Sequence, residues 1–141
     1  MIKFNLKIKH MKLEDLDIYN ISMESGDEVW FSVVEWENLA KYSIGQQIIK
    51  SADSIAANIA EGFGRYHFKD HKNFMFYARG SHFETITWLT KAKNRNIISI
   101  EFYEGIISKM ERLGVKMNNY INTLESKTAN SNNSRNHNKS L

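Results

Sequence analysis

The chain contains no proline among its 141 residues, and this constrains its fold more than any other feature. Proline interrupts helices and marks the edges of sheets, so its absence favours long, uninterrupted helices. Cysteine is also absent, which excludes disulfides and thiolate metal sites. A chain of this length suits one domain with a single core. We therefore expect one all-α domain.

Apolar residues recur at helical spacing from about Lys12 onward. The stripe expected to face the core in a first helix consists of Leu16, Tyr19, Met23, Trp30 and Val33. The period is lost over residues 36–42, which we expect to turn the chain into a second helix. The apolar seam of that helix consists of Ile44, Ile48, Ala52, Ile55 and Ile59. Gly62 follows the seam directly, and we expect it to end the helix as a left-handed C-cap.

Two further helices are expected after the glycine-rich break. The third runs from Lys69 to about Arg95, and residues 94–96 form a short connection. Ser99 is a plausible N-cap for the fourth. The stripe of the fourth helix consists of Phe102, Ile106, Met110, Leu113, Met117, Tyr120 and Leu124. Four helices with mostly short loops predict an antiparallel, up-down-up-down four-helix bundle over residues 12–126.

The two ends of the chain differ from the bundle in composition. Residues 1–11 alternate apolar and polar side chains as a strand does, and we expect an N-terminal arm that contacts another subunit or frays. Residues 127–141 are polar and low in complexity, so we expect a disordered tail. The first twenty residues mix charged and apolar residues, which fits neither a signal peptide nor a membrane span. The expected compartment is the cytoplasm.

Charge is unevenly distributed although the net charge is only +3. Residues 1–64 carry six Lys/Arg against ten Asp/Glu, whereas residues 65–95 carry seven against two. Basic residues interleaved with aromatic ones suit single-stranded RNA or DNA, although a solvated face beside core aromatics has the same pattern. The interleaved aromatics are Tyr66, Phe68, Phe76 and Tyr77. The candidate phosphate contacts are Lys69, Lys72, Arg79, Lys91, Lys93 and Arg95.

The Gly62–Arg65 turn could bind an anion or simply end a helix. It lacks the Lys-Ser/Thr pair of a P-loop, and no strand precedes it, so a helix end is the favoured interpretation. No nucleophile elbow, Ser-His-Asp signature or paired carboxylates are present. We therefore expect no enzymatic activity and no cofactor.

Histidines and carboxylates leave two further alternatives open. His67, His71 and His82 could share one helix face and bind a metal, but without a carboxylate at matching spacing they are expected to be polar surface residues. Glu61 and Glu84 lie beside apolar seams, where a charge needs a partner. The expected partners, in a buried or interfacial ion-pair network, are Arg65 and Arg79.

Two runs of the sequence are the most specific: Asn58-Ile59-Ala60-Glu61-Gly62-Phe63-Gly64-Arg65, and Ala78-Arg79-Gly80-Ser81 followed by Glu84. With these runs, residues 12–124 resemble the four-helix-bundle proteins of the 23S rRNA intervening-sequence family. The resemblance implies a homopentamer without enzymatic activity. Some similar proteins are encoded within inserted segments of bacterial ribosomal RNA genes. Distant relatives are accessory proteins of diversity-generating retroelements, which bind a reverse transcriptase and nucleic acid.

The resemblance also implies roles for the residues that match its motifs. Carried onto this chain, they are expected to organise the turn and the packing of the second helix on the third, near a subunit interface. They are Asn58, Glu61, Gly62, Gly64, Arg65, Arg79, Gly80, Ser81 and Glu84. We expect an accessory protein that binds RNA, DNA or a nucleic-acid enzyme. The alternative is a structural oligomer whose partner is a polypeptide.

Overall fold

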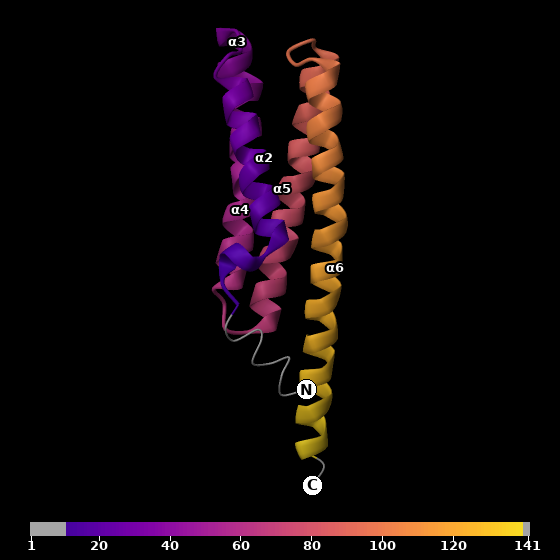
Figure 1. Cartoon of the computed structure of the whole chain (residues 1–141). Coiled ribbons are helices and arrows are strands. Elements are labelled where there is room, and N and C mark those ends of the chain that lie inside the picture. The colour runs from indigo at the N-terminus through magenta and orange to yellow at the C-terminus, as the bar shows by residue number, and fades with distance from the viewer. Residues whose placement is uncertain (1–10, 140–141) are drawn as a thin grey trace.

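The structure is a computed structural model that describes residues 11–139. The predicted arm of residues 1–11 therefore lies outside the described residues except for Met11. The helical elements follow one another with short connections (Figure 1). They are η1 (Leu13–Asp15), α2 (Asp17–Val33), α3 (Asn38–Ala40), the π-helical turn η2 (Lys41–Gly45), α4 (Gln46–Phe63), α5 (Phe68–Asn94) and α6 (Ile100–Lys139).

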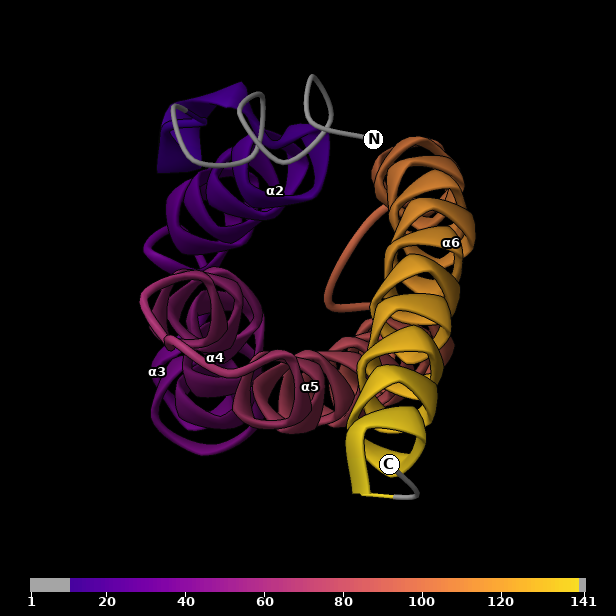
Figure 2. The same cartoon turned by 90° about the horizontal axis from the view of Figure 1, so that it is seen from below.

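The long helices α2, α4, α5 and α6 form the predicted four-helix bundle. Each packs against two neighbours: α4 contacts α2 and α5, and α6 contacts α5 and α2. Consequently α2 and α5 occupy diagonally opposite corners of the bundle (Figure 2). The prediction of an all-α bundle is confirmed. Among the described residues, no helix has an apolar stretch long enough to cross a membrane.

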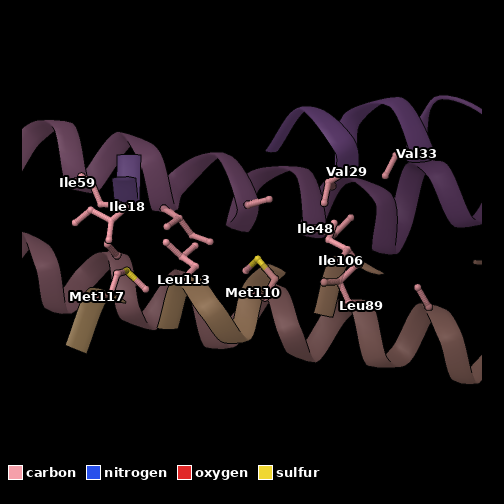
Figure 3. Packing of buried hydrophobic residues seen from close by; sticks show 14 of the residues in the cluster. Ile18, Val29, Val33, Ile48, Ile59, Leu89, Ile106, Met110, Leu113 and Met117 are labelled. Carbon is pink, nitrogen blue, oxygen red and sulfur yellow. The ribbon is translucent and has the colours of Figure 1, made fainter. Parts of the chain in front are cut away.

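The core is built from the two most regular stripes in the sequence. All five members of the α4 seam are buried, and so are most members of the α6 stripe. Figure 3 shows Ile48 of α4 close to Leu89 of α5 and Ile106 of α6 at one end of the view, and Ile59 of α4 on the same side as Ile18 and close to Met117 of α6 at the other end. Complete burial of a side chain of this size contributes about 1.5–3 kcal/mol. The apolar stripes of α4 and α6 therefore form the centre of the hydrophobic core.

The stripe expected in the first helix is buried only in part: Leu16 and Val33 are buried, and Tyr19 packs against the core, but Met23 and Trp30 are not buried. Met23 is 45% exposed and Trp30 is 50% exposed. The buried face consists of Ile18, Ser22, Ser25, Gly26, Val29 and Val33. Its small residues let α2 lie close to α4, since a Cβ atom on Gly26 would come within 2.8 Å of Asp53 Oδ1. The hydrophobic pattern predicted that bulky residues of α2 are buried, whereas the residues that allow close packing against α4 are small.

The end of α4 also differs from the prediction. The helix continues through Gly62 to Phe63, and its C-cap Gly64 has a φ of −76°. No glycine among residues 11–139 has a positive φ, so Gly62 is not a left-handed cap. Gly62 is instead buried, and a Cβ atom there would lie 2.9 Å from Phe74 Cβ and 3.0 Å from His71 O. Its function is close contact between α4 and α5.

A left-handed residue ends α5 rather than α4. Asn96 has a φ of 57°, and its backbone N–H donates to Lys93 O while the N–H of Ile97 donates to Ala92 O. This is the pattern of a Schellman helix end. Ser99 then caps α6, because its Oγ accepts a hydrogen bond of 3.1 Å from the N–H of Phe102. The predicted connection and the predicted N-cap are therefore confirmed.

The predicted disordered tail is helical in the structure. Helix α6 continues to Lys139 instead of ending near residue 126. Adding a residue to an existing helix gains one hydrogen bond without a new nucleation cost, and no proline stops the extension. All residues from 129 to 137 are exposed. The extension therefore adds length to α6 without enlarging the core.

Candidate nucleic-acid interface

The six predicted phosphate contacts lie along α5 and at its C-cap. Lys69 and Lys72 are in the first two turns, whereas Lys91 and Lys93 are in the last turn and Arg95 follows as the C-cap. Twenty-two residues separate Lys69 from Lys91, which corresponds to about 33 Å of helix. The residues therefore form two groups at opposite ends of the bundle, with Arg79 between them, rather than one continuous patch.

The basic group at the end of α5 consists of Lys91, Lys93 and Arg95. Lys91 and Arg95 are exposed, and Lys93 Nζ lies 4.4 Å from the centre of the Tyr103 ring. Beside this group is an open groove of about 860 Å³ between α5 and the start of α6. Its lining includes Lys93, Asn96, Ser99 and Tyr103. Cationic, aromatic and amide side chains thus line the same groove.

Arg79 is held by α6. Its Nη1 donates a hydrogen bond of 3.3 Å to Asn118 Oδ1, and its Cζ lies 4.9 Å from the centre of the Phe76 ring. Its side chain therefore belongs to the α5–α6 contact. Of the other aromatics, Tyr66 is 95% exposed and Tyr77 is 58% exposed. Phe68 lies beneath Lys127 Nζ at 5.5 Å.

The motif residues of α4 act locally. Asn58 Nδ2 donates to Ser54 O at 2.9 Å. The predicted pair of Arg65 with Glu61 forms at 2.6 Å, but both side chains are about half exposed. The guanidinium of Arg65 also lies 4.7 Å from the Phe74 ring centre. The pair is thus a surface contact, which contributes little to stability.

The second half of the predicted ion-pair network does not form within the described residues. Glu84 is exposed and accepts a hydrogen bond of 3.2 Å from Trp88 Nε1, while Arg79 bonds to Asn118. The expectation of a buried network within one chain is therefore wrong. Arg65 lies in the connection between α4 and α5 and pairs with Glu61, whereas Arg79 lies on α5 and bonds to Asn118 of α6, so the two arginines have separate partners.

Thr85 and Ser51 form a buried polar link between α5 and α4, to which Ser81 contributes only its backbone carbonyl. Ser81 O accepts a hydrogen bond of 2.8 Å from Thr85 Oγ1. Thr85 Oγ1 also lies 3.0 Å from Ser51 Oγ. Both hydroxyls are buried, and their mutual contact satisfies them there. Gly80, in contrast, is exposed, and a Cβ atom at its position would have nothing within 4 Å.

The histidines do not form a metal site. His67 is exposed before α5, as expected, but the expectation of surface histidines is wrong for His71 and His82, which are buried between α5 and α6. His71 Nε2 lies 3.2 Å from Tyr120 Oη, and His82 Nε2 lies 2.6 Å from Met110 O. Within residues 11–139, no three His, Cys, Asp or Glu side chains are placed to hold one metal ion.

Burial perturbs these two histidines and the tyrosine beside them. Desolvation, aided by the positive charge of Lys127, lowers the pKa of His71 to about 4. Desolvation also lowers the pKa of His82, against the opposing effect of its bond to Met110 O. Burial raises the pKa of Tyr120 to about 12. All three groups are therefore neutral at pH 7 and serve as packing residues.

Ion pairs between α2 and α6 were not predicted. Lys109 bonds to Glu28 and lies 3.4 Å from Glu24, and the hydrogen bond to Glu28 is the main cause that raises the pKa of Lys109. Lys116 pairs with Asp17 at 3.1 Å. These partners are 81 to 99 residues apart in sequence, so local charge patterning could not have identified them.

The comparisons with known proteins agree with this architecture. A protein with unknown function from the S23 ribosomal protein family of Bacteroides thetaiotaomicron has a similar crystal structure, with a TM-score of 0.68 and 23% sequence identity. The match covers 74% of this chain and 97% of that one, and at this identity it supports the fold alone. No curated protein matches the sequence. The family model described as 23S rRNA-intervening sequence protein matches residues 14–119. This chain therefore belongs to the 23S rRNA-intervening sequence protein family.

Proposed function

We propose that the protein is a non-enzymatic, homopentameric accessory protein that binds RNA or DNA through the basic end of α5. The observation that carries this proposal is the grouping of Lys91, Lys93 and Arg95 beside the groove that Tyr103 lines. Lysine and arginine supply phosphate contacts, and an aromatic ring gives an unpaired base a stacking surface. A flexible single strand fits such a groove better than a rigid duplex.

Self-association would strengthen a site of this size. Three cations in one subunit make few phosphate contacts, so one site alone binds weakly at physiological salt. Several copies in one assembly act on the same strand, and the effective concentration of the second site raises the apparent affinity. The family resemblance supports a pentamer as the assembly. The modest net charge of one chain is compatible with nucleic-acid binding in that form.

We expect the triple variant Lys91→Gln/Lys93→Gln/Arg95→Gln to lose most of its affinity for single-stranded RNA. Three phosphate contacts per site correspond to a change of about 2 in the slope of log K against log salt. The measurement is a fluorescence-anisotropy titration of labelled RNA at two salt concentrations. Absence of binding by the unaltered protein at about 50 mM salt would contradict the proposal, because phosphate contacts are strongest at low salt.

A matched control removes positive charge elsewhere. Lys50 of α4 and Arg112 and Arg135 of α6 are exposed outside the groove, so Lys50→Gln/Arg112→Gln/Arg135→Gln removes the same number of charges without touching it. This variant is expected to retain the affinity and the salt slope. An equal loss in the control and the triple variant would show that only the overall charge matters, and the proposed site would then be wrong.

A second candidate is a structural oligomer that binds a polypeptide, such as a reverse transcriptase, and no nucleic acid. The exposed aromatic side chains on α2 and α5 favour it, because single-helix surfaces of this kind are used to bind proteins. Affinity purification from the native host with and without nuclease separates the two candidates. Recovery of one protein partner after nuclease treatment, together with no RNA affinity, supports the second.

A further inference from the structure

The outer side of α2 carries an apolar stripe that the bundle does not bury. It consists of Met23, Trp30, Phe31 and Val34, and we call it the outer α2 stripe. Phe31 is 69% exposed, and Met23, Trp30 and Val34 follow one another at spacings of seven and four, so they lie along one line of the helix. A helix with two apolar faces is typical of one that packs on both sides.

The outer side of α5 carries a feature of complementary shape. Tyr77 and Phe83 are exposed and flank Gly80 at three residues on either side, so all three lie on one helix face. We call this the Gly80 notch. Within residues 11–139, nothing outside the backbone of its own helix lies within 4 Å of the position of a Cβ on Gly80. A glycine in the middle of a helix costs about 1 kcal/mol relative to alanine, and the bundle itself does not use the space that it opens.

The charges of the two helices are complementary. Residues 12–37, which include α2, carry eight acidic residues and only one lysine. Helix α5 carries five basic residues and two acidic ones. Lys109 and Lys116 of α6 neutralise part of the acidic set, but Asp27 lies within the outer α2 stripe, between Met23 and Trp30. Beside Gly80 the charges of Arg79 and Glu84 balance, and the four lysines of α5 lie toward the two ends of the helix. The attraction between the acidic α2 and the basic α5 therefore acts along the length of the two helices and not at the notch itself.

The position of these two helices determines what kind of contact they can make. Because α2 and α5 occupy opposite corners of the bundle, their outer faces point away from each other (Figure 2). One chain therefore cannot bring its own stripe to its own notch, whereas two chains can do so head to tail. A head-to-tail contact leaves a free stripe at one end and a free notch at the other, and repetition closes a ring or extends a filament.

We propose that the occupant of the Gly80 notch is a second copy of this chain, whose Trp30 inserts between Tyr77 and Phe83. The indole stacks on these rings, and the bare backbone at Gly80 gives it the depth to do so. This inference rests on the self-association included in the proposed function and names its surfaces. The two basic ends of α5 lie outside the notch, so the contact leaves Lys91 and Arg95 accessible to phosphates.

The sharpest test is Gly80→Gln, since it has opposite effects on the subunit and on the assembly. Glutamine is a better helix former than glycine, and a Cβ at position 80 meets no described atom within 4 Å outside the backbone of its own helix, so the subunit is expected to become more stable. The same side chain fills the notch, so sedimentation velocity is expected to show monomers of 16.5 kDa. Gly105→Gln is the matched control, because Gly105 is also exposed with nothing within 4 Å. It is expected to stabilise the subunit and leave the assembly intact.

A mixing experiment tests the head-to-tail arrangement. Trp30→Gln removes the inserted side chain and, as loss of a central interface tryptophan, is expected to weaken association at least about 30-fold. A mixture of this variant with Gly80→Gln restores one good interface and is expected to form heterodimers and nothing larger. Three results would overturn the proposal: a monomeric unaltered protein, an assembly that survives either substitution alone, or a mixture without heterodimers.

Failure of this inference can be told from failure of the proposed function. The RNA titration measures the affinity of the basic end of α5 for RNA, whereas sedimentation measures the self-association that the Gly80 notch and the outer α2 stripe are proposed to mediate. An assembled protein with no RNA affinity would contradict the function and leave the interface standing. RNA affinity in a protein whose Gly80→Gln variant stays assembled would contradict the interface alone.

Discussion

Replacing Gly62 by valine is expected to destabilise the protein by about 3 kcal/mol, the upper end of what overpacking costs. Even the Cβ atom alone would lie 2.9 Å from Phe74 Cβ and 3.0 Å from His71 O. Neither atom is the far end of a flexible side chain, so α4 and α5 would have to separate. The measurement is the free energy of unfolding from urea denaturation followed by circular dichroism, with a lower midpoint at an unchanged slope.

Gly64 provides the matched control for this substitution. Its φ of −76° suits any residue, and the atoms nearest to an added Cβ are Glu61 O at 3.6 Å and Ala60 O at 3.7 Å. Gly64→Ala is therefore expected to change stability by less than about 0.5 kcal/mol. Equal effects at the two glycines would contradict the close-packing role of Gly62 and favour a role in the turn.

Acidification from pH 7 to pH 5 is expected to cost about 2 kcal/mol of stability through His71 alone. The folded pKa of about 4 lies below the value of 6.5 for an unburied histidine. Below pH 6.5 the unfolded chain therefore binds a proton that the folded chain does not, and stability falls until the pH approaches 4. His82 adds to the loss, because burial lowers its pKa in the same direction. Urea denaturation at a series of pH values measures the decline.

His71→Gln is expected to flatten this pH dependence, because it removes the group whose protonation differs between the two states. His67→Gln removes an exposed histidine at the start of α5 and is expected to leave the profile as it is. Stability that stays level or rises between pH 7 and pH 5 would contradict the burial of neutral histidines between α5 and α6. So would an equal flattening by both substitutions.

The sequence predicted the bundle because its strongest patterns report the core directly. The isoleucine seam of α4 and the stripe of α6 repeat at helical spacing with no proline to interrupt them, and both are buried as expected. The pattern failed at α2, where Met23 and Trp30 are bulky but exposed. It also failed at Gly62, which was expected to end α4 as a left-handed C-cap but continues the helix. The close contact of Gly62 with α5 agrees with the packing of the second helix on the third that the family resemblance implied. In both places small residues mark close helix contacts, and hydrophobicity does not register them.

The candidate site was predicted less completely than the fold. The sequence located the basic residues on one helix, but their separation into two groups follows from the length of α5. The contacts of Arg79 with Asn118 and of Lys93 with Tyr103 depend on how α6 lies against α5. Spacing within one segment contains no information about such partners. The Thr85–Ser51 contact was not predicted for the same reason. A small hydroxyl residue beside the apolar seam of α4 and another on α5 could have indicated it.

The extension of α6 beyond Leu124 divides this helix into two parts with different cooperativity. Up to Leu124 its hydrogen bonds are lost only when the bundle comes apart, since Met110, Leu113 and Met117 are buried against the other helices. From residue 129 to 137 every residue is exposed, so the backbone there opens by fraying from its end. Fraying does not disturb the core. A single continuous helix thus joins a globally protected foldon to a segment that opens and closes independently of it.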